Sequence, residues 1–148
     1  MWFKKAAQRG HAGAQFQLGD AYERGELDLA IDLVAARTWY HKAADINAAE
    51  GGHARAQWRL AIAYEDGELD LAIDLVVALM WFKKAAEGGD EDAQWRLAIA
   101  YQKGELDLAI DLDAARTFYQ NAAERGHARA QFRLGCATKT ASSTWRST

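Results

Sequence analysis

The 148-residue chain contains no proline and one cysteine, Cys136. A lone cysteine cannot form a disulfide within the chain, and it lacks the CxxC partner of thiolate metal sites and redox motifs. No apolar run approaches the roughly 20 residues that a membrane-spanning helix needs. The N-terminal segment MWFKKAAQRG lacks the apolar core and small-residue cleavage site of a secretion signal. We therefore expect no membrane segment and, for the chain as it stands, a cytoplasmic location.

An excess of one charge is also missing. The chain has 18 basic and 21 acidic residues and a net charge of −3, so it offers no global attraction to nucleic acid or anionic lipid. It also lacks a nucleophile with a matched base, a phosphate-cradling glycine loop and a carboxylate pair in distinct surroundings. The sequence therefore predicts no nucleic-acid partner, no cofactor, no catalytic residues and no enzyme.

Internal repetition is what the chain has in abundance. The string GELDLAIDL occurs three times unchanged, and the motif AQ(F/W)xL occurs four times. The first string begins at Gly25, Gly67 and Gly104, at intervals of 42 and 37 residues. A period of roughly 40 residues is typical of one supersecondary unit copied along a solenoid. The repeats therefore decide the fold class.

Each repeat predicts two helices. In the first, helix A, residues Ala56, Leu60, Ala63 and Tyr64 share one face at helical spacing. Helix A ends at a glycine of positive φ, and a later aspartate caps the second helix, helix B. These glycines are Gly25, Gly67 and Gly104, and the aspartates are Asp32, Asp74 and Asp111. We expect the connector between them to be extended, with its apolar side chains beneath the helix pair.

Helix B carries an aromatic pair followed by two alanines. The pairs are Trp39-Tyr40, Trp81-Phe82 and Phe118-Tyr119. The order A-x-x-x-L-(G/A)-x-x-Y-x-x-G, an aspartate, then A-x-x-(W/F)-(Y/F)-x-x-A-A resembles the Sel1-like repeat family, whose members are α/α solenoids related to tetratricopeptide repeats. The resemblance covers residues 1–136 and implies an all-α superhelix that works as a scaffold in protein complexes, often in bacteria. One departure is Glu-Leu-Asp in place of the family's second glycine and valine, which leaves the turn geometry open.

The predicted organisation is a single array over residues 1–136. It comprises a half repeat over 1–10, full repeats over about 11–52, 53–89 and 90–126, and a half repeat over 127–136. Five extra residues within Asp45–Glu50 account for the longer interval. Residues 137–148 break the pattern, and deleting one base from a tyrosine codon in a coding sequence for AYENGELDLAID reproduces them residue for residue. We therefore interpret the end as a frameshifted tail, weakly ordered or ordered only by accidental contact, and the chain as part of a longer array.

Two metal-site interpretations are weaker than structural ones. His11, His53 and His127 share one repeat position, but equivalent positions lie one repeat apart and do not converge on an ion. We expect them to be helix-start residues. Glu26 and Asp28 lie near Asp32, but the string lacks the ligand pattern of an EF-hand loop. The sequence thus predicts no metal site.

Helix A carries the candidate partner-binding surface. Placing Leu60 toward the core puts Trp58 and Ile62 on the opposite side and Arg59 on the flank, at roughly 100° per residue. The equivalent residues elsewhere are Phe16, Gln17, Trp95, Arg96, Ile99, Phe132 and Arg133. A concave row of aromatics and arginines suits a protein or peptide segment. The alternative is that these aromatics pack between successive repeats.

A second function also stays open, a structural or self-associating module. The half repeats at the two ends are predicted to expose Trp2, Phe3, Phe132 and Leu134. A solenoid without polar caps tends to stack on another copy. A homo-oligomer formed through these ends is therefore the alternative to a scaffold that binds another protein.

Overall fold

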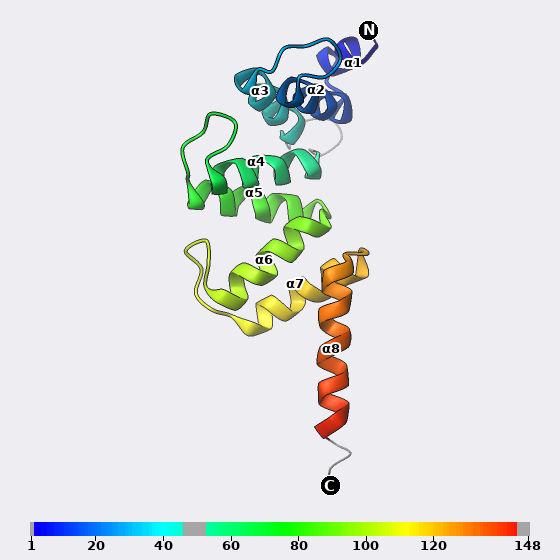
Figure 1. The fold of residues 1–148 in the computed structure, drawn as a ribbon, viewed down its shortest axis with the longest axis vertical. Coiled ribbons are helices and arrows are strands. Elements are labelled where there is room, and N and C mark those ends of the chain that lie inside the picture. The colour runs from blue at the N-terminus through cyan, green and yellow to red at the C-terminus, as the bar shows by residue number, and fades with distance from the viewer. Residues whose placement is uncertain (1, 46–52, 145–148) are drawn as a thin grey trace. The chain divides into compact units, whose positions relative to one another are not determined.

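The computed structural model describes residues 2–45 and 53–144, and every element in these ranges is an α-helix (Figure 1). The helices are α1 (Trp2–Gln8), α2 (Ala12–Arg24), α3 (Leu33–Ala44), α4 (Ala54–Asp66), α5 (Leu75–Glu87), α6 (Glu91–Lys103), α7 (Leu112–Glu124) and α8 (Ala128–Thr144). Helices α2, α4, α6 and α8 are the predicted helices A, and α1, α3, α5 and α7 are the predicted helices B. The all-α fold of repeated helix pairs is confirmed.

The chain forms two compact units, residues 1–90 and 91–148. In the first unit the most extensive helix contacts join α2 to α3 and α4 to α5, and α1 and α3 each also pack on the helix A that follows. In the second unit α6 packs on α7 and α7 packs on α8. Each unit is thus built from the same two contacts, one within a repeat and one between neighbouring repeats.

Local signals set the helix boundaries as predicted. Gly25, Gly67 and Gly104 have φ values of 68°, 73° and 71°, a left-handed conformation that glycine adopts without a steric penalty. The side chain of Asp32 accepts a hydrogen bond from the Ala35 amide at 2.9 Å. Asp74 and Asp111 cap helices α5 and α7 in the same way. The sequence motif therefore ends one helix and begins the next.

The interior follows the predicted faces of the two helices. On helix A, Ala56, Leu60 and Ala63 are completely buried. On helix B, Tyr40 and Phe82 are completely buried, and so are the alanines that follow them, apart from a slightly exposed Ala86. The Tyr40 ring lies so close to Gly19 of the neighbouring helix that a β-carbon there would be 2.8 Å away, and pairing large rings with small residues in this way allows close packing.

The connector differs from the predicted extended segment. Leu27 and Asp28 have φ values of 56° and 58°, and the Leu29 amide donates to the Glu26 carbonyl at 3.1 Å, which defines a type I′ turn. The same turn recurs at Leu69-Asp70 and Leu106-Asp107. The apolar side chains are only partly covered, since Leu69 is 3% exposed but Leu27 is 57% exposed. Leucine in this turn is strained, because type I′ turns favour Asn-Gly.

We expect the double change Leu27→Asn, Asp28→Gly to raise the free energy of unfolding by about 1 kcal/mol, because it relieves left-handed strain at an exposed site. The matched change Leu69→Asn, Asp70→Gly relieves the same strain but removes a buried leucine worth about 1.5–3 kcal/mol. We expect it to lower stability. Urea denaturation of the two variants measures both changes in unfolding free energy. If both variants were more stable than wild type, or both less stable, this account would be contradicted.

Helix α8 extends beyond the predicted end of the array. Its backbone is helical to Thr144. That the tail after Cys136 is weakly ordered, or ordered only by accidental contact, stays a prediction. The origin of residues 137–148 stays a hypothesis, and Trp145 and Arg146 lie outside the described residues. The predicted five-residue insertion falls on residues 45–50, of which only Asp45 is described.

Candidate functional site

Two pockets built from equivalent residues lie between neighbouring helices A, one in each unit. The pocket of the first unit has a volume of about 310 Å³ and is lined by Phe16, Asp20, Glu23, Arg24, Tyr40, Arg55, Trp58 and Arg59. The pocket of the second unit has a volume of about 440 Å³ and is lined by Trp95, Ala128, Arg129, Phe132, Arg133 and Cys136. Six of the predicted partner-binding residues therefore line these two pockets.

The aromatic side chains of helix A also join successive repeats. Phe16 stacks on His53 with 4.9 Å between ring centroids and lies 5.6 Å from the Tyr40 ring. Trp95 stacks in the same way on His127 at 4.7 Å. One side of each of these rings therefore packs between repeats, as in the alternative interpretation. Another side of each ring lines a pocket. Phe132 is 75% exposed.

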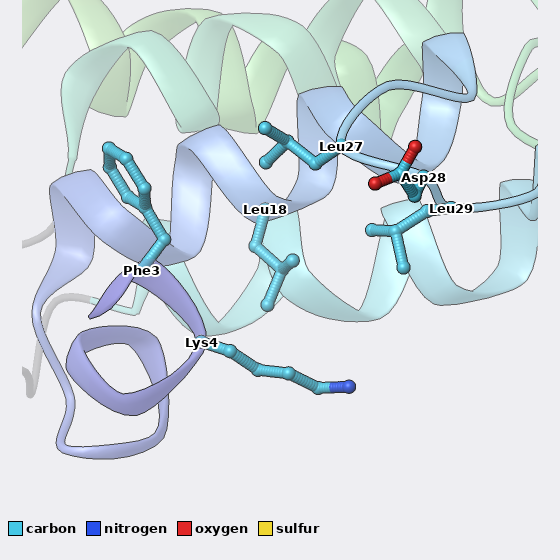
Figure 2. Close-up of a pocket in the computed structure, with 6 residues that line it drawn as sticks. All are labelled: Phe3, Lys4, Leu18, Leu27, Asp28 and Leu29. Carbon is cyan, nitrogen blue, oxygen red and sulfur yellow. The ribbon is translucent and has the colours of Figure 1, made fainter. Parts of the chain in front are cut away.

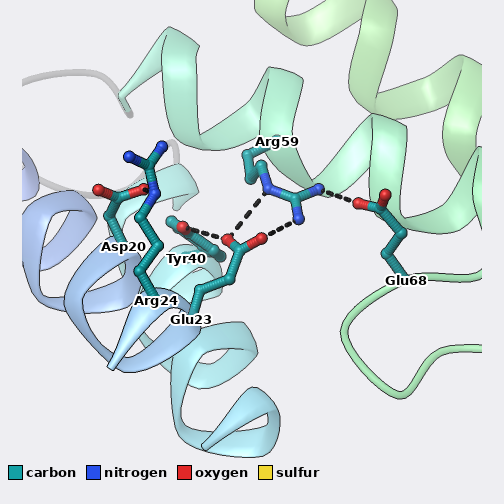
Figure 3. A network of polar contacts seen from close by, with 6 residues as sticks. All are labelled: Asp20, Glu23, Arg24, Tyr40, Arg59 and Glu68. Carbon is teal, nitrogen blue, oxygen red and sulfur yellow. Dashed lines mark hydrogen bonds and ion pairs between the residues drawn. The ribbon is translucent and has the colours of Figure 1, made fainter. Parts of the chain in front are cut away.

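In the first unit a network of charges joins two repeats through Arg59 (Figure 3). The guanidinium of Arg59 donates to both carboxylate oxygens of Glu23, with 3.1 Å between Nε and Oε2, and to Glu68 Oε2 at 2.6 Å. The Tyr40 hydroxyl donates to Glu23 Oε2 at 2.7 Å. The side chains of Arg59 and Glu23 are only 17% and 21% exposed. Arg59 therefore holds the helix A of one repeat to that of the next.

The surroundings of this network shift its protonation equilibria. Burial raises the pKa of Glu23, but the hydrogen bonds from Arg59 and Tyr40 and the charge of Arg59 outweigh burial, so this pKa lies below its usual range. Burial lowers the pKa of Arg59, and Glu23 and Glu68 outweigh it, so this pKa is raised. Burial, followed by Glu23, raises the pKa of Tyr40. All three effects favour the ionised pair and the protonated phenol.

The second unit lacks the acidic residue at the centre of this network. Gln102 takes the place of Glu23 and accepts a hydrogen bond from the Tyr119 hydroxyl at 2.7 Å. Arg133, the equivalent of Arg59, lies over the Tyr119 ring with 5.0 Å from Cζ to the ring centroid. Burial raises the pKa of Tyr119, against an opposing effect of the Arg133 charge. In the described part of this unit no carboxylate pairs with Arg133.

The match to a known family decides what kind of repeat this is. A family model described as the Sel1 repeat matches residues 1–11, 12–47, 54–90 and 91–127, most of the chain. The chain belongs to the Sel1 repeat family. Sel1 repeat proteins are generally scaffolds for protein interaction, and the family is generally non-catalytic.

Two solved structures show the same Sel1 architecture. The crystal structure of a Sel1 repeat protein from Oxalobacter formigenes is 34% identical, with a TM-score of 0.77 over 90% of this chain and 94% of that chain. The crystal structure of c5321, a protective antigen present in uropathogenic Escherichia coli strains and displaying an SLR fold, is 36% identical with a TM-score of 0.75. That match covers 90% of this chain and only 27% of c5321. A comparison with curated proteins found no match.

The other predicted partner-binding residues of the Sel1 array are less available. Arg96 donates to Glu105 at 2.8 Å, so its charge is paired within its own unit. Ile99 packs against the buried cluster of Ala98, Ala115 and Tyr119, and Ile62 is half-buried. Gln17 is exposed and lines a different pocket, beside Phe3. The helix A row is therefore partly core and partly surface.

The predicted self-association residues differ in exposure. Trp2 is 88% exposed and Phe3 is 50% exposed. Leu134 is half-buried and packs against the Ala98 cluster. This leucine points into its own unit because it occupies the core position of helix A, equivalent to the buried Leu60 and Leu97.

The repeated histidines are helix-start residues, as expected. The Nδ1 atoms of His53 and His127 accept hydrogen bonds from the amides of Ala56 at 3.3 Å and Ala130 at 3.2 Å. His11 occupies the N-cap of α2. Among the described residues no group of three or more metal-ligating side chains comes together. No helix in the described ranges has the length and apolar character needed to cross a membrane.

Sequence reasoning missed Arg55 and Arg129, which stand at one repeat position on α4 and α8. Arg55 lies over the Trp58 ring at 4.2 Å and forms an ion pair with Asp90 at 3.3 Å. Arg129 lines the pocket of the second unit. A signal was available, since the string ARAQ(W/F)R occurs at both places.

Proposed function

We propose that this Sel1 repeat chain is a scaffold that binds an acidic, partly apolar segment of a protein partner in the pocket between α6 and α8. One observation supports this choice of pocket. In the first unit the equivalent arginines, Arg55 and Arg59, are paired with carboxylates of their own unit. Among the described residues of the second unit, no carboxylate pairs with Arg129 or Arg133. The second pocket therefore has positive charge available for a ligand.

The chemistry of the lining favours a carboxylate beside an apolar side chain. Arginine binds carboxylates with two parallel hydrogen bonds, which orients the ligand as well as attracting it. Phe132 and Trp95 supply apolar surface next to these charges. Aromatic and arginine side chains dominate the energetics of protein interfaces. An acidic residue with a leucine or phenylalanine nearby would use both parts of the pocket.

The proposed site binds a ligand without catalysing a reaction, and the proposed ligand is a segment of a protein. The net charge of −3 gives the chain no general attraction to a polyanion such as nucleic acid. The favourable contacts in the pocket are local and need a ligand with a defined spacing of charge and apolar surface. The equivalent pocket in the first unit, with Trp58 and Phe16, is a weaker second site because its arginines are already neutralised.

A peptide titration tests this function. The probe is a fluorescein-labelled peptide that alternates glutamate with leucine and phenylalanine, and the matched probe has glutamine in place of glutamate. We expect the acidic probe to bind wild-type protein and the double variant Arg129→Gln, Arg133→Gln to bind it at least about tenfold more weakly, since a charge-assisted hydrogen bond is worth about 1.5–3 kcal/mol. Fluorescence anisotropy measures the affinity.

Two control variants sharpen the result. Arg116→Gln removes one positive charge from an exposed site on α7 that does not line the pocket, and we expect unchanged binding. Gln102→Glu places a carboxylate where Glu23 holds Arg59, so it should pair with Arg133 and weaken binding of the acidic probe. Failure of the acidic probe to bind, or equal binding of both probes, would refute the proposed site.

A further inference from the structure

The exposed side of α5 differs from that of the helices B in the neighbouring repeats. Val76 and Met80 lie one helical turn apart on the same face, and they are 69% and 41% exposed. The equivalent residues are Val34 and Thr38 on α3, and Asp113 and Thr117 on α7. Polar residues thus serve at both positions on α7 and at one of them on α3. The fold itself therefore does not need two apolar side chains here.

Two more apolar residues stand close to this pair along the chain. Ile73 lies in the connector, three residues before Val76, and is 64% exposed. Leu79 is half-buried and stands where α3 and α7 have arginine. We call Ile73, Val76, Leu79 and Met80 the α5 apolar face. Neighbouring exposed apolar side chains of this kind commonly mark an interaction site.

The shape of the α5 apolar face favours another helix as its ligand. Elsewhere in the first unit, Phe3, Leu18 and Leu27 line a concave pocket of about 250 Å³, as Figure 2 shows. Small molecules bind in concave pockets of this kind. Val76 and Met80 stand instead on the exposed ridge of a helix, and helices pack by fitting the ridges of one between those of another. A helix with apolar residues at the same spacing therefore fits this surface.

Charges of opposite sign lie at the two ends of the α5 apolar face. Asp70 and Asp74 are exposed at the end where α5 begins. Lys83 is exposed on the same side of the helix as Met80, one turn further along. A helix of the same sequence that runs antiparallel to α5 would place its lysine beside Asp74 and its own aspartates beside Lys83. The face is thus complementary to itself in charge as well as in apolar spacing.

We infer that two copies of this chain associate through α5, with the two α5 helices antiparallel and Met80 of each copy packed against Val76 of the other. The occupant is a second copy because of this self-complementarity. Glu87, the next residue on this side after Lys83, lies outside the overlap, since it falls beyond Leu75, where the α5 of the other copy begins. The same surface of each copy takes part, so the contact is isologous and closes as a dimer.

The area available sets the expected strength of the dimer. One helix face is smaller than the roughly 800 Å² that each partner contributes to a standard interface, so we expect dimers to form at about 0.1 mM protein and above. The inference does not rest on the proposed peptide site, which lies between α6 and α8 in the other unit. Peptide binding and dimerisation can therefore each fail without the other.

Sedimentation equilibrium up to about 1 mM protein tests the inference with residues taken from the other repeats. Val76→Asp introduces the residue that α7 has at this position, and Met80→Thr introduces the residue that α3 and α7 have, so the double variant should fold. We expect wild type to show a monomer–dimer equilibrium and the double variant to have an association constant at least about tenfold lower. Circular dichroism checks that the helices are intact.

A matched control makes one of these changes at the same repeat position on another helix. Val34→Asp alters an exposed site on α3, where threonine stands one turn later in place of methionine, and this variant should dimerise like wild type. Strictly monomeric wild-type protein would overturn the inference and leave the α5 apolar face to a helix of another protein. Species larger than a dimer, or a double variant that dimerises like wild type, would also overturn it.

Lys83→Glu tests the antiparallel arrangement. In the dimer it would bring like charges together at both ends of the contact, so it should weaken association at low salt and have a smaller effect at high salt. Lys103→Glu makes the same change at an exposed site on α6, away from the α5 apolar face, and should leave association unchanged. Association that Lys83→Glu does not weaken at low salt would overturn the proposed pairing.

Discussion

Replacing Phe82 with alanine is expected to lower the free energy of unfolding of the first unit by about 3–5 kcal/mol, the largest effect of any single change considered for this chain. Phe82 is completely buried on α5, and Ala61 on α4 is completely buried as well. Its removal loses the transfer free energy of an aromatic ring and leaves a cavity that helices fixed at both ends cannot fully close. Urea denaturation measures the loss.

Phe3→Ala is the matched control, because it removes the same side chain from the same repeat position. Phe3 is 50% exposed, so we expect a loss below about 1 kcal/mol in dilute, monomeric protein. Phe82→Tyr is a second control, since Tyr40 and Tyr119 occupy this position in the other repeats and it should be tolerated. Similar losses for Phe82→Ala and Phe3→Ala would contradict the packing described.

Because the protein has two units, the place where Phe82→Ala lowers stability is as informative as the amount by which it does so. Hydrogen exchange should show faster opening in α4 and α5 and little change in α7. In repeat proteins each repeat contacts only its neighbours, so damage is expected to spread by one repeat at most. A single cooperative transition of the whole chain would instead distribute the loss evenly.

The sequence predicted what short-range chemistry decides. Gly67 and Asp74 end and begin helices through their own backbone preferences and through hydrogen bonds to amides two or three residues away, and both were assigned correctly. The buried face of α4 followed from helical spacing alone. These features depend on nearest neighbours along the chain, so one sequence suffices to find them.

The connector turn could not be predicted from residue preferences. Leu69 and Asp70 adopt positive φ values that leucine rarely takes, and Leu69 does so while its side chain is buried. In the same turn the guanidinium of Arg37 on α3 donates to the Asp70 carbonyl at 3.0 Å. Leu27 adopts the same turn with its side chain 57% exposed, so neither burial nor the Arg37 contact is common to all three copies. The backbone hydrogen bonds that close the connector onto the end of helix A are common to all three, and residue preferences do not reveal them.

The sequence predicted which types of residue form the candidate site, but it did not predict which of these residues pair with one another. Arg59 and Arg133 occupy one repeat position and looked equivalent in sequence. Their environments differ because Glu23, 36 residues before Arg59, is replaced by Gln102 in the second unit. The contacts between residues of neighbouring repeats depend on how each repeat is rotated relative to the one before it. The spacing of residues along the chain does not reveal this rotation.

The Glu23→Gln variant is expected to lose about 1–3 kcal/mol of stability at pH 7, because it removes the charged acceptor from a partly buried arginine. Hydrogen bonding and charge hold the pKa of Glu23 in the folded chain below its ordinary value of 4.5, despite burial. Ionised Glu23 therefore contributes stability that is fully present above about pH 5 and is lost as the pH falls through the lowered pKa.

This linkage fixes how the variant should behave in acid. The difference in unfolding free energy between wild type and Glu23→Gln should be greatest near neutral pH and should shrink as Glu23 takes up a proton, because protonated glutamate and glutamine resemble each other in shape and charge. Urea denaturation at a series of pH values between 7 and 3 measures this difference. A difference that stays constant across the series would mean that Glu23 acts through packing and not through its charge.

Asp20→Asn makes the same change of acid to amide on the same helix and serves as the control. Asp20 pairs with Arg24 at 3.1 Å, one helical turn away, and the Arg24 side chain is 65% exposed. Exposed pairs of this spacing contribute about 0.3–0.5 kcal/mol. We expect a small loss for Asp20→Asn and a large one for Glu23→Gln, because only Glu23 joins two repeats and compensates a buried charge.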